Sequence, residues 1–201
     1  MFTSDRKRKE EEMRARHRLP PGQALTEKWP VLHYGDVPRF DPARWDFRVE
    51  GLVENPLRWS WEEFQKLPRT SILTDIHCVT RWSRFDTVFE GVAFKVIYDL
   101  VRPRPEARFV MVHAEQDFTA NVPVEDLLRD NVLLATHADG NALTPEHGYP
   151  LRLVVPHLYL WKSVKWMRGM EFVAADRPGF WERNGYHMYG DPWKEQRFDY
   201  D

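Results

Sequence analysis

The chain has one cysteine, Cys78, within the segment ILTDIHCVTRW at residues 72–82. The thiol follows an apolar run and precedes two positive charges, Arg81 and Arg84. A lone cysteine is most often a small buried apolar side chain, but beside cations it also has the surroundings of a reactive thiolate. Three kinds of chemistry are open to it: a zinc site, a cysteine–histidine nucleophile, and a thiolate ligand to a redox metal.

The spacing of other possible metal ligands and proton acceptors helps to distinguish these three kinds of chemistry. His77 adjoins the cysteine, but neighbouring side chains of a strand point to opposite faces, and no Cys-x-x-Cys or His-x-x-x-His pair is present. The spacing therefore disfavours zinc. The other histidines leave a cysteine–histidine nucleophile open, although no local signature supports it. A redox metal whose other ligands come from an organic cofactor needs only one thiolate ligand from the protein.

The composition excludes several classes of protein. The 201 residues are enough for one packed domain, and a formal net charge of −2 provides no field that would attract nucleic acid. One cysteine cannot form an intrachain disulfide, and no run of about 20 apolar residues predicts a membrane span. The first residues lack the apolar core of a secretory signal. We expect a soluble, cytoplasmic protein, and the nine Trp within a 14% aromatic content predict a ring-lined pocket.

The pattern of apolar residues predicts a mixed, β-rich α+β domain with short helices. Alternation predicts a strand at 45–49, and the capping-box pair Ser60 and Glu63 begins a short helix that ends before Pro68. We expect further helices at 92–101 and after Pro123, and further strands at 108–114, 132–138, 151–155 and 164–173.

The charged start of the chain is predicted to be separate from this domain. Residues 5–18 mix acidic and basic side chains with almost nothing to bury, and the Pro-Pro-Gly sequence at 20–22 breaks any helix. We therefore expect a flexible arm at 1–22, either a frayed helix or a disordered segment, followed by one domain at 23–201.

Three segments, in order, resemble the molybdopterin domain of the sulfite oxidase family: HCVTRWS at 77–83, HGYPLRLVVP at 147–156 and KSVKWMRGMEF at 162–172. The match spans roughly residues 30–190 and is best to the small, stand-alone members. The resemblance implies the β-rich fold of that family, a molybdenum-molybdopterin cofactor and oxygen-atom transfer at the metal. In that family a cysteine in the position of Cys78 ligates molybdenum beside the dithiolene sulfurs of the pterin.

The resemblance also implies roles for other side chains. Arg81 is expected to favour the Cys78 thiolate and attract a substrate oxygen, and Tyr186 to hydrogen-bond an oxygen at the metal, so that these three are the catalytic residues. Arg152 and Lys165 are expected to hold the anionic part of the pterin. The cofactor contacts of the family correspond to His33, Tyr34, Cys78, Asp117, His147, Arg152, Ser163, Val164 and Lys165.

Substrate and partners follow from the same resemblance. Sulfite oxidases carry more cations after the cysteine than the Val-Thr-Arg-Trp at 79–82, so we expect a small sulfur-containing or other oxyanion or oxide substrate, with sulfite itself in doubt. Too few residues remain for a haem or dimerisation domain, so electrons are expected to pass through a separate partner. The alternative is a protein that binds or carries molybdopterin without turnover, because a fold does not imply a function.

Overall fold

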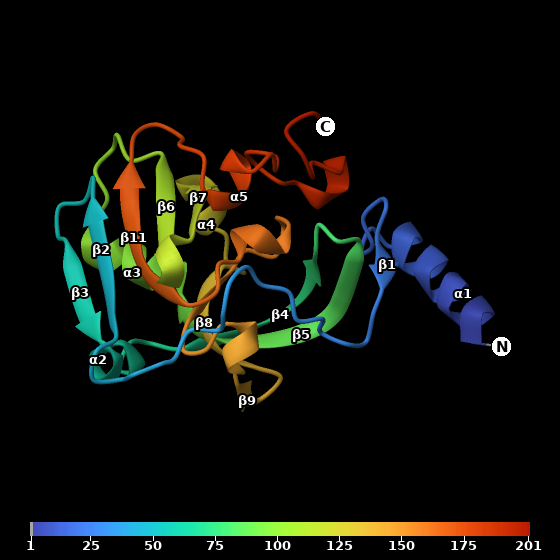
Figure 1. The fold of residues 1–201 in the computed structure, drawn as a ribbon, viewed down its shortest axis with the longest axis horizontal. Helices are drawn as coiled ribbons and strands as arrows, with labels where there is room; N and C mark the ends of the chain where they lie inside the picture. Colours follow the sequence, from blue (N-terminus) through green and yellow to red (C-terminus); the bar gives the residue numbers. More distant parts are fainter. Residues whose placement is uncertain (1) are drawn as a thin grey trace.

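Two β-sheets form the body of the molecule, and short helices lie at their edges and ends (Figure 1). The computed structural model describes residues 2–201. Strands outnumber helices and most of the helices are short, so the β-rich α+β class expected from the sequence is confirmed.

The first sheet has five strands in the order β3-β2-β11-β6-β7. β2 and β11 run parallel, and the other neighbours are antiparallel. Sequence-distant segments therefore meet at the centre of this sheet. The strands are β2 (Asp46–Gly51), β3 (Leu57–Ser60), β6 (Phe109–Ala114), β7 (Thr119–Pro123) and β11 (Met167–Val173).

The second sheet has six strands, with β1, β5, β8 and β10 in sequence across it, β4 beside β5, and β9 beside β8. Its largest unit is the antiparallel hairpin of β4 and β5, whose tip carries the cysteine. The strands are β1 (Ala24–Leu25), β4 (Thr70–His77), β5 (Trp82–Ala93), β8 (Leu133–Ala138), β9 (Asn141–Ala142) and β10 (Arg152–Val154).

Within residues 2–201, five α-helices and four 3-10 helices lie before, between and after these strands. The predicted capping box is present: the Ser60 hydroxyl accepts from the Glu63 backbone N–H, and the Glu63 carboxylate accepts from the Ser60 backbone N–H. The helices are α1 (Phe2–Ala15), α2 (Trp61–Gln65), α3 (Phe94–Val101), α4 (Val124–Leu127), α5 (Phe180–Arg183), η1 (Glu115–Asp117), η2 (Pro145–His147), η3 (Leu160–Lys162) and η4 (Pro192–Lys194).

One hydrophobic core joins the two sheets. Phe47, Val110 and Phe172 of the first sheet lie in the same cluster as Val92 and Leu134 of the second, each at most 1% exposed. Burying a side chain of this size stabilises the folded state by about 1.5–3 kcal/mol. The shared core therefore fixes the sheets relative to each other and holds the loops at their ends in place.

The helix predicted at 92–101 begins two residues later than expected. β5 continues through Ala93 because Gly91, Val92 and Ala93 pair with β8. A Cβ on Gly91 would lie 2.0 Å from the Leu134 carbonyl oxygen, so only glycine allows the two strands to approach this closely. Strand pairing across the chain therefore overrides the local helical spacing.

The strand predicted at 164–173 also begins later, at Met167. The preceding residues follow β10 through single hydrogen bonds, from the Leu153 N–H to the Val164 carbonyl and from the Met167 N–H to the Leu151 carbonyl. Trp166 has a φ of 55°, which interrupts extended geometry. This interruption turns the Ser-Val-Lys segment toward the cavity described below.

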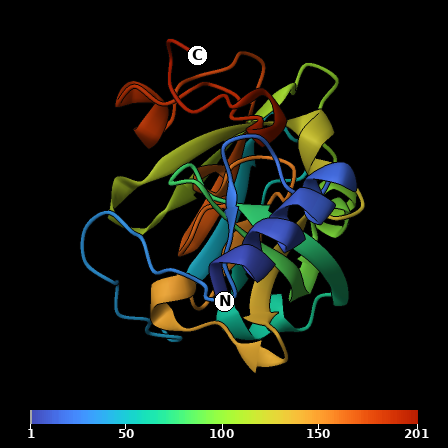
Figure 2. The same ribbon diagram turned by 90° about the vertical axis from the view of Figure 1, so that its right-hand side faces the viewer.

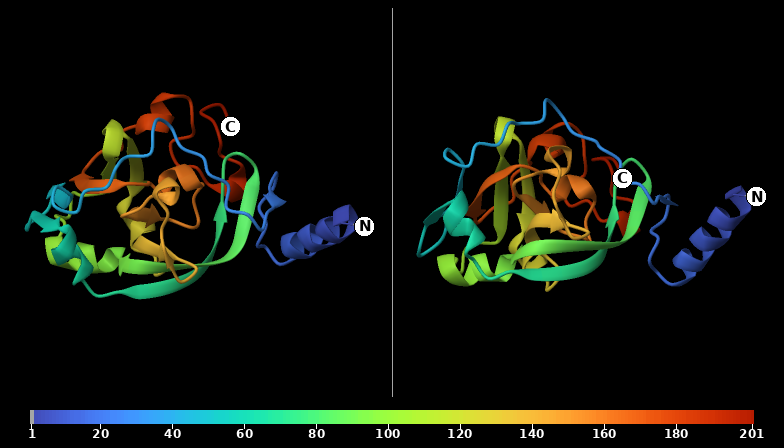
Figure 3. Two further views of the ribbon diagram at one scale, coloured as in Figure 1. Left: turned by 60° about the horizontal axis from the view of Figure 1, so that its bottom comes forward. Right: turned by 90° about the horizontal axis from the view of Figure 1, so that it is seen from below.

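The start of the chain consists of a helix and a long extended segment. α1 projects from the body of the molecule (Figure 1), and it lies in front when this side faces the viewer (Figure 2). Its end is fastened by Arg14, which donates to the Pro20 and Gln23 carbonyls. Residues 26–44, which we call the strap, then cross the molecule toward β2 (Figure 3). The helix is one of the two forms expected for the arm, and the arm's flexibility stays a prediction.

Within residues 2–201, no helix combines the length and the apolar character that crossing a lipid bilayer requires.

Candidate active site

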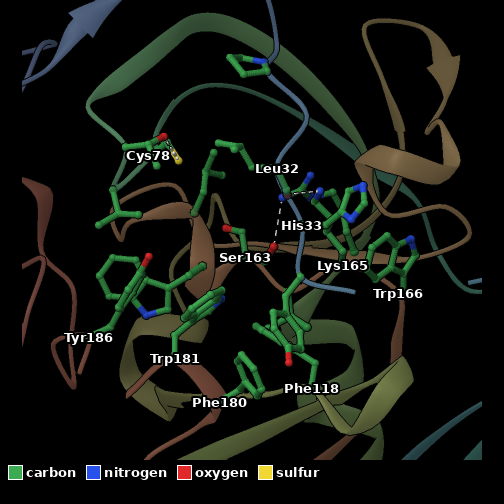
Figure 4. A pocket seen from close by; sticks show the side chains of 18 of the residues that line it. Leu32, His33, Cys78, Phe118, Ser163, Lys165, Trp166, Phe180, Trp181 and Tyr186 are labelled. Carbon is green, nitrogen blue, oxygen red and sulfur yellow. Dashed lines mark hydrogen bonds between the residues drawn. The ribbon is translucent and has the colours of Figure 1, made fainter. Parts of the chain in front are cut away.

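A cavity of about 320 Å³ lies between the strap, the tip of the β4–β5 hairpin and the segment that follows β11 (Figure 4). It is the ring-lined pocket that the composition predicted. The predicted site residues in its wall are His33, Tyr34, Cys78, Arg152, Ser163, Val164, Lys165 and Tyr186. The structure therefore brings together residues from four separate parts of the sequence.

Cys78 sits in the tight turn at the tip of the hairpin. Its backbone N–H donates to the Trp82 carbonyl at 2.9 Å, and its carbonyl accepts from the Arg81 N–H at 3.0 Å. The same carbonyl accepts from the Gln23 side chain, so the segment before the strap also holds the turn. The Cys78 residue is 7% exposed and its sulfur lies 3.1 Å from the Thr80 hydroxyl oxygen.

The surroundings of the thiol influence its protonation in opposite directions. Burial raises the pKa of Cys78, whereas the Thr80 hydroxyl and the positive charge of Lys165 lower it in part. His77 is no proton acceptor for the thiol, because its Nδ1 lies 2.8 Å from the Ser83 hydroxyl and burial lowers the His77 pKa to about 4. A cation or metal bound beside the sulfur would favour the thiolate.

Arg152 and Lys165 form the cationic end of the cavity. Arg152 is 2% exposed and donates to the His147 and Ser163 carbonyls, while Lys165 donates to the Leu32 and Glu146 carbonyls. Burial lowers the pKa of Arg152 to about 10 and that of Lys165 to about 7. Neither side chain forms an ion pair with a carboxylate of the described residues, so this end has unneutralised positive charge that suits an anion.

His147 lies behind this cationic end and is outside the cavity lining. Its Nε2–H donates to the Trp29 carbonyl at 3.2 Å, so its Nδ1 accepts from the Thr144 hydroxyl at 2.9 Å. The ring stacks on Trp29 with centroids 4.2 Å apart, and burial lowers the His147 pKa. His147 therefore orients Trp29 and, through its own carbonyl, Arg152.

Arg81 is displaced from the place that the sequence predicted for it. It has a φ of 71°, its side chain is 63% exposed, and its guanidinium lies 4.0 Å from Glu195, outside the cavity lining. The left-handed turn directs the side chain outward. Lys165 is instead the cation whose charge favours a thiolate at Cys78.

Asp117 is likewise outside the lining, although its neighbours Glu115 and Gln116 belong to it. Gln116 and Asp117 have φ values of 60° and 55°, and two consecutive left-handed residues redirect the side chains of this loop. Residue types alone do not reveal that reversal.

The strap places His33 and Tyr34 at the rim of the cavity. The His33 Nδ1 lies 2.9 Å from the Gly35 carbonyl oxygen, and its ring meets Trp166 edge to face at 5.7 Å. Tyr34 is 61% exposed and its ring lies 4.8 Å from Phe180. Both side chains can therefore contact a molecule that enters the cavity.

The other end of the cavity is aromatic. We call Phe118, Trp161, Phe180, Trp181 and Tyr186 the aromatic wall. The Tyr186 ring is edge to face with Trp161 at 5.0 Å and stacked on Trp181 at 4.8 Å. Phe118 and Phe180 continue the wall with centroids 5.4 Å apart.

The sequence identified only Tyr186 of this wall. The motif FWERNGYH at 180–187 contains two more of its members, and an aromatic cluster of this kind was the available signal. Burial raises the pKa of Tyr186, and negative charge at Cys78 raises it further. The phenol therefore keeps its proton at neutral pH and can donate a hydrogen bond into the cavity.

A model of the family described as oxidoreductase molybdopterin binding domain matches residues 34–181. This span covers most of the chain and most of the cavity wall. The chain belongs to this family. The protein is accordingly a molybdopterin-dependent oxidoreductase with a molybdenum cofactor, as the sequence resemblance predicted.

Relatives of this molybdopterin domain include proteins of similar and of greater length. The chain is 51% identical over 185 residues to the uncharacterized oxidoreductase YuiH of Bacillus subtilis, covering 92% of this chain and 93% of YuiH. It is 29% identical to the putative protein-methionine-sulfoxide reductase subunit YedZ1 of Azospira oryzae, covering 85% of this chain and 66% of that protein. It is 27% identical to the protein-methionine-sulfoxide reductase catalytic subunit MsrP of Campylobacter jejuni, covering 75% of this chain and 56% of MsrP.

The fold of this molybdopterin domain also resembles a solved structure. The sulfane dehydrogenase SoxCD from Paracoccus pantotrophus superimposes with a TM-score of 0.66 at 24% sequence identity, covering 76% of this chain and 43% of that chain. This likeness confirms the sulfite oxidase-type fold that the three sequence motifs predicted.

The residues of the cavity fit the cofactor of the family. Among the described residues, no group of three His, Cys, Asp or Glu side chains could hold a metal ion, so a metal beside Cys78 must bring its other ligands with it. A dithiolene cofactor does this, and its anionic phosphate suits the unneutralised charge of Arg152 and Lys165. Cys78 would hold the metal, and the cationic end would hold the organic part.

Proposed function

We propose that this oxidoreductase reduces neutral sulfoxides to sulfides. Each turnover takes up two electrons and two protons, breaks the S–O bond and releases a sulfide and water. The bound molybdenum cofactor supplies the oxygen-atom and electron exchange. A separate electron carrier supplies the electrons one at a time.

The distribution of charge in the cavity carries this proposal. Lys165 lies with His33 and Trp166 on one side, whereas Cys78 and Tyr186 lie on the other (Figure 4). Arg152 and Lys165 are the arginine and lysine side chains of the described lining, and the cofactor would use both. An anionic substrate such as nitrate or sulfite needs positive charge where it reacts. The aromatic wall instead suits an uncharged, polarizable group.

The residues of the wall have defined tasks in such a reaction. The Tyr186 hydroxyl donates a hydrogen bond to the sulfoxide oxygen, which gains negative charge as the S–O bond weakens. Trp161 and Trp181 flank that phenol and set its direction. The rings also exclude water, which strengthens the hydrogen bond.

The names of two relatives support a sulfoxide substrate. YedZ1 is named a putative protein-methionine-sulfoxide reductase subunit and MsrP a catalytic subunit of such a reductase. This chain spans about two thirds of the first and 56% of the second, so their activity enters here only as support for a proposal. The subunit names are also in line with a separate electron-transfer partner.

A dye-linked assay of cofactor-loaded protein tests the proposal. Reduced methyl viologen serves as electron donor with dimethyl sulfoxide, methyl p-tolyl sulfoxide or nitrate, and sulfite is assayed with an oxidised acceptor. We expect kcat/KM for the sulfoxides to exceed that for nitrate at least about tenfold, a difference of 1.4 kcal/mol. Faster turnover of nitrate or sulfite than of every sulfoxide would overturn the proposal. The cytoplasmic location expected from the sequence is part of this proposal, and cell fractionation tests it.

A further inference from the structure

A buried ion pair lies directly behind the aromatic wall. The Lys162 ammonium donates to Glu182 Oε1 at 2.6 Å, and the two side chains are 1% and 0% exposed. Lys162 also donates to the backbone and side-chain oxygens of Asn121 and to the Met188 carbonyl. The Trp161 indole N–H donates to the same Glu182 Oε1 at 2.8 Å. One carboxylate oxygen therefore holds both a charge and a ring of the cavity wall.

A buried ion pair of this kind contributes little net stability to a fold. Removing two charges from water costs several kcal/mol per ion, and apolar residues of similar volume are often as stable. The second carboxylate oxygen, Glu182 Oε2, is buried and has no hydrogen-bond partner among the described residues, which adds to the free-energy cost. The pair therefore calls for a role beyond stability.

The positions of the pair indicate that role. Lys162 follows Trp161 at the end of η3, and Glu182 follows Trp181 within α5. Each charged residue is thus adjacent in sequence to an indole of the aromatic wall. The Tyr186 backbone N–H donates to the Trp181 carbonyl at 3.0 Å, so the backbone that carries the phenol is fixed to the same helix. The ion pair joins the two segments that carry these rings.

We propose that Glu182 is a positioning residue for the aromatic wall and that Lys162 holds it in place. The Glu182 oxygen sets the Trp161 ring through the indole N–H, and Trp161 in turn fixes the direction of the Tyr186 ring. The inference rests on the proposed function in one respect, that the wall binds the substrate. It adds that substrate size is selected by a hydrogen bond outside the cavity.

Two double variants of the cofactor-loaded protein separate this role from a structural one. Lys162→Met with Glu182→Gln and Lys162→Met with Glu182→Leu both remove the buried charges. They differ in whether residue 182 can accept the Trp161 N–H. We expect the Gln variant to keep KM and kcat for methyl p-tolyl sulfoxide within about twofold. We expect the Leu variant to raise this KM about tenfold and also to lower kcat, because Tyr186 then loses the ring that fixes its direction.

A smaller substrate gives the internal comparison. Dimethyl sulfoxide contacts less of the wall, so its KM should change less than that of the aromatic sulfoxide in the Leu variant. Equal KM values for the two double variants, or a wild-type KM in the Leu variant, would overturn the proposal. If either double variant fails to fold, Trp161→Phe tests the proposal instead. This change removes the indole N–H and leaves the Lys162–Glu182 ion pair in place. An unchanged KM for methyl p-tolyl sulfoxide in Trp161→Phe would also overturn the proposal.

A readout without turnover keeps this proposal distinct from the proposed function. The stacked and edge-to-face contacts of Trp161, Trp181 and Tyr186 contribute to the near-UV circular dichroism. We expect the Gln variant to keep that signal and the Leu variant to lose part of it. Absence of sulfoxide turnover in the wild type would end the proposed function alone, whereas identical spectra for the two variants would end the positioning role.

Discussion

The cationic end and the aromatic end of the cavity are built in different ways. Arg152 and Lys165 belong to two short motifs close together in the sequence, and their hydrogen bonds go to backbone carbonyls of neighbouring loops. The aromatic wall takes its rings from the residue after η1, from η3, from α5 and from the loop behind α5. Its rings are held mainly by one another and by a buried carboxylate.

This difference indicates that the two ends of the cavity have separate functions. The cationic end has the chemistry to hold an anionic cofactor. Tyr186 and Trp181 of the aromatic wall lie on the other side of the cavity from Lys165 (Figure 4). The proposed sulfoxide would react on that side. Changes at one end should therefore affect cofactor content, and changes at the other should affect turnover.

Cys78→Ser should have the largest effect. The sulfur would hold the metal, and both cofactor binding and turnover depend on that metal. We expect turnover to fall to background, since a serine hydroxyl is a poor ligand for a soft metal. X-ray absorption of the molybdenum should show one sulfur neighbour fewer than in wild-type protein made in the same cells. An unchanged number of metal–sulfur neighbours would contradict both the site and the comparison.

Lys165→Met should next reduce cofactor content. A hydrogen bond from a charged group contributes about 1.5–3 kcal/mol, so cofactor affinity should fall about tenfold to a hundredfold. Metal analysis and the fluorescence of the released, oxidised pterin measure this loss. Lys95→Met is the matched control, because Lys95 pairs with Asp99 on the exposed face of α3. Full cofactor content in Lys165→Met would contradict the assignment of the cationic end.

Tyr186→Phe should affect turnover and leave cofactor content unchanged. Removing one hydrogen-bond donor to a developing charge costs about a hundredfold in kcat. Tyr200→Phe is the control, since Tyr200 is 79% exposed. A loss of cofactor equal to the loss of activity would mean that the two ends are not separate.

Lys165 should also give the cofactor-free protein a pH-dependent stability. Burial, followed by the charge of Arg152, lowers its pKa from 10.5 to about 7. Between these two pH values the unfolded chain binds a proton that the folded chain lacks, so stability against urea should rise with pH across this window. Below pH 7 the cost of the buried ammonium is fully present. The rise should be smaller in Lys165→Met, and an identical rise would place the titrating group elsewhere.

Arg81→Gln should have the smallest effect, because the guanidinium is exposed and outside the cavity. We expect unfolding free energy to change by less than about 0.5 kcal/mol and kcat/KM to stay within about twofold. A loss of turnover comparable to that of Tyr186→Phe would show that Arg81 reaches the substrate after all.

Local patterns were enough to predict much of the fold. The capping box at Ser60 and Glu63 and the strands at 45–49 and 108–114 depend on neighbouring residues, so the sequence displays them directly. The boundary between β5 and α3 could not be predicted, because it depends on the close approach of Gly91 to β8.

The site residues likewise fall into those that the sequence predicted and those whose position it did not reveal. Three residues belong to motifs whose residue types indicate anion and metal binding, and all three line the cavity: Cys78, Arg152 and Lys165. The outward direction of Arg81 depends on one left-handed residue in a turn, which residue type alone does not reveal for an arginine. The sequence therefore predicted which chemistry is present better than which cation faces it.

The residue types alone establish that one cysteine, an arginine and a lysine are present in an order typical of molybdopterin domains, because these identities are properties of single residues. The tertiary structure places Lys165 and the five rings of the aromatic wall in the lining of the cavity and leaves Arg81 outside it. Those outcomes depend on how distant segments pack around a shared core. Packing of this kind is a property of the whole chain, which no single motif contains.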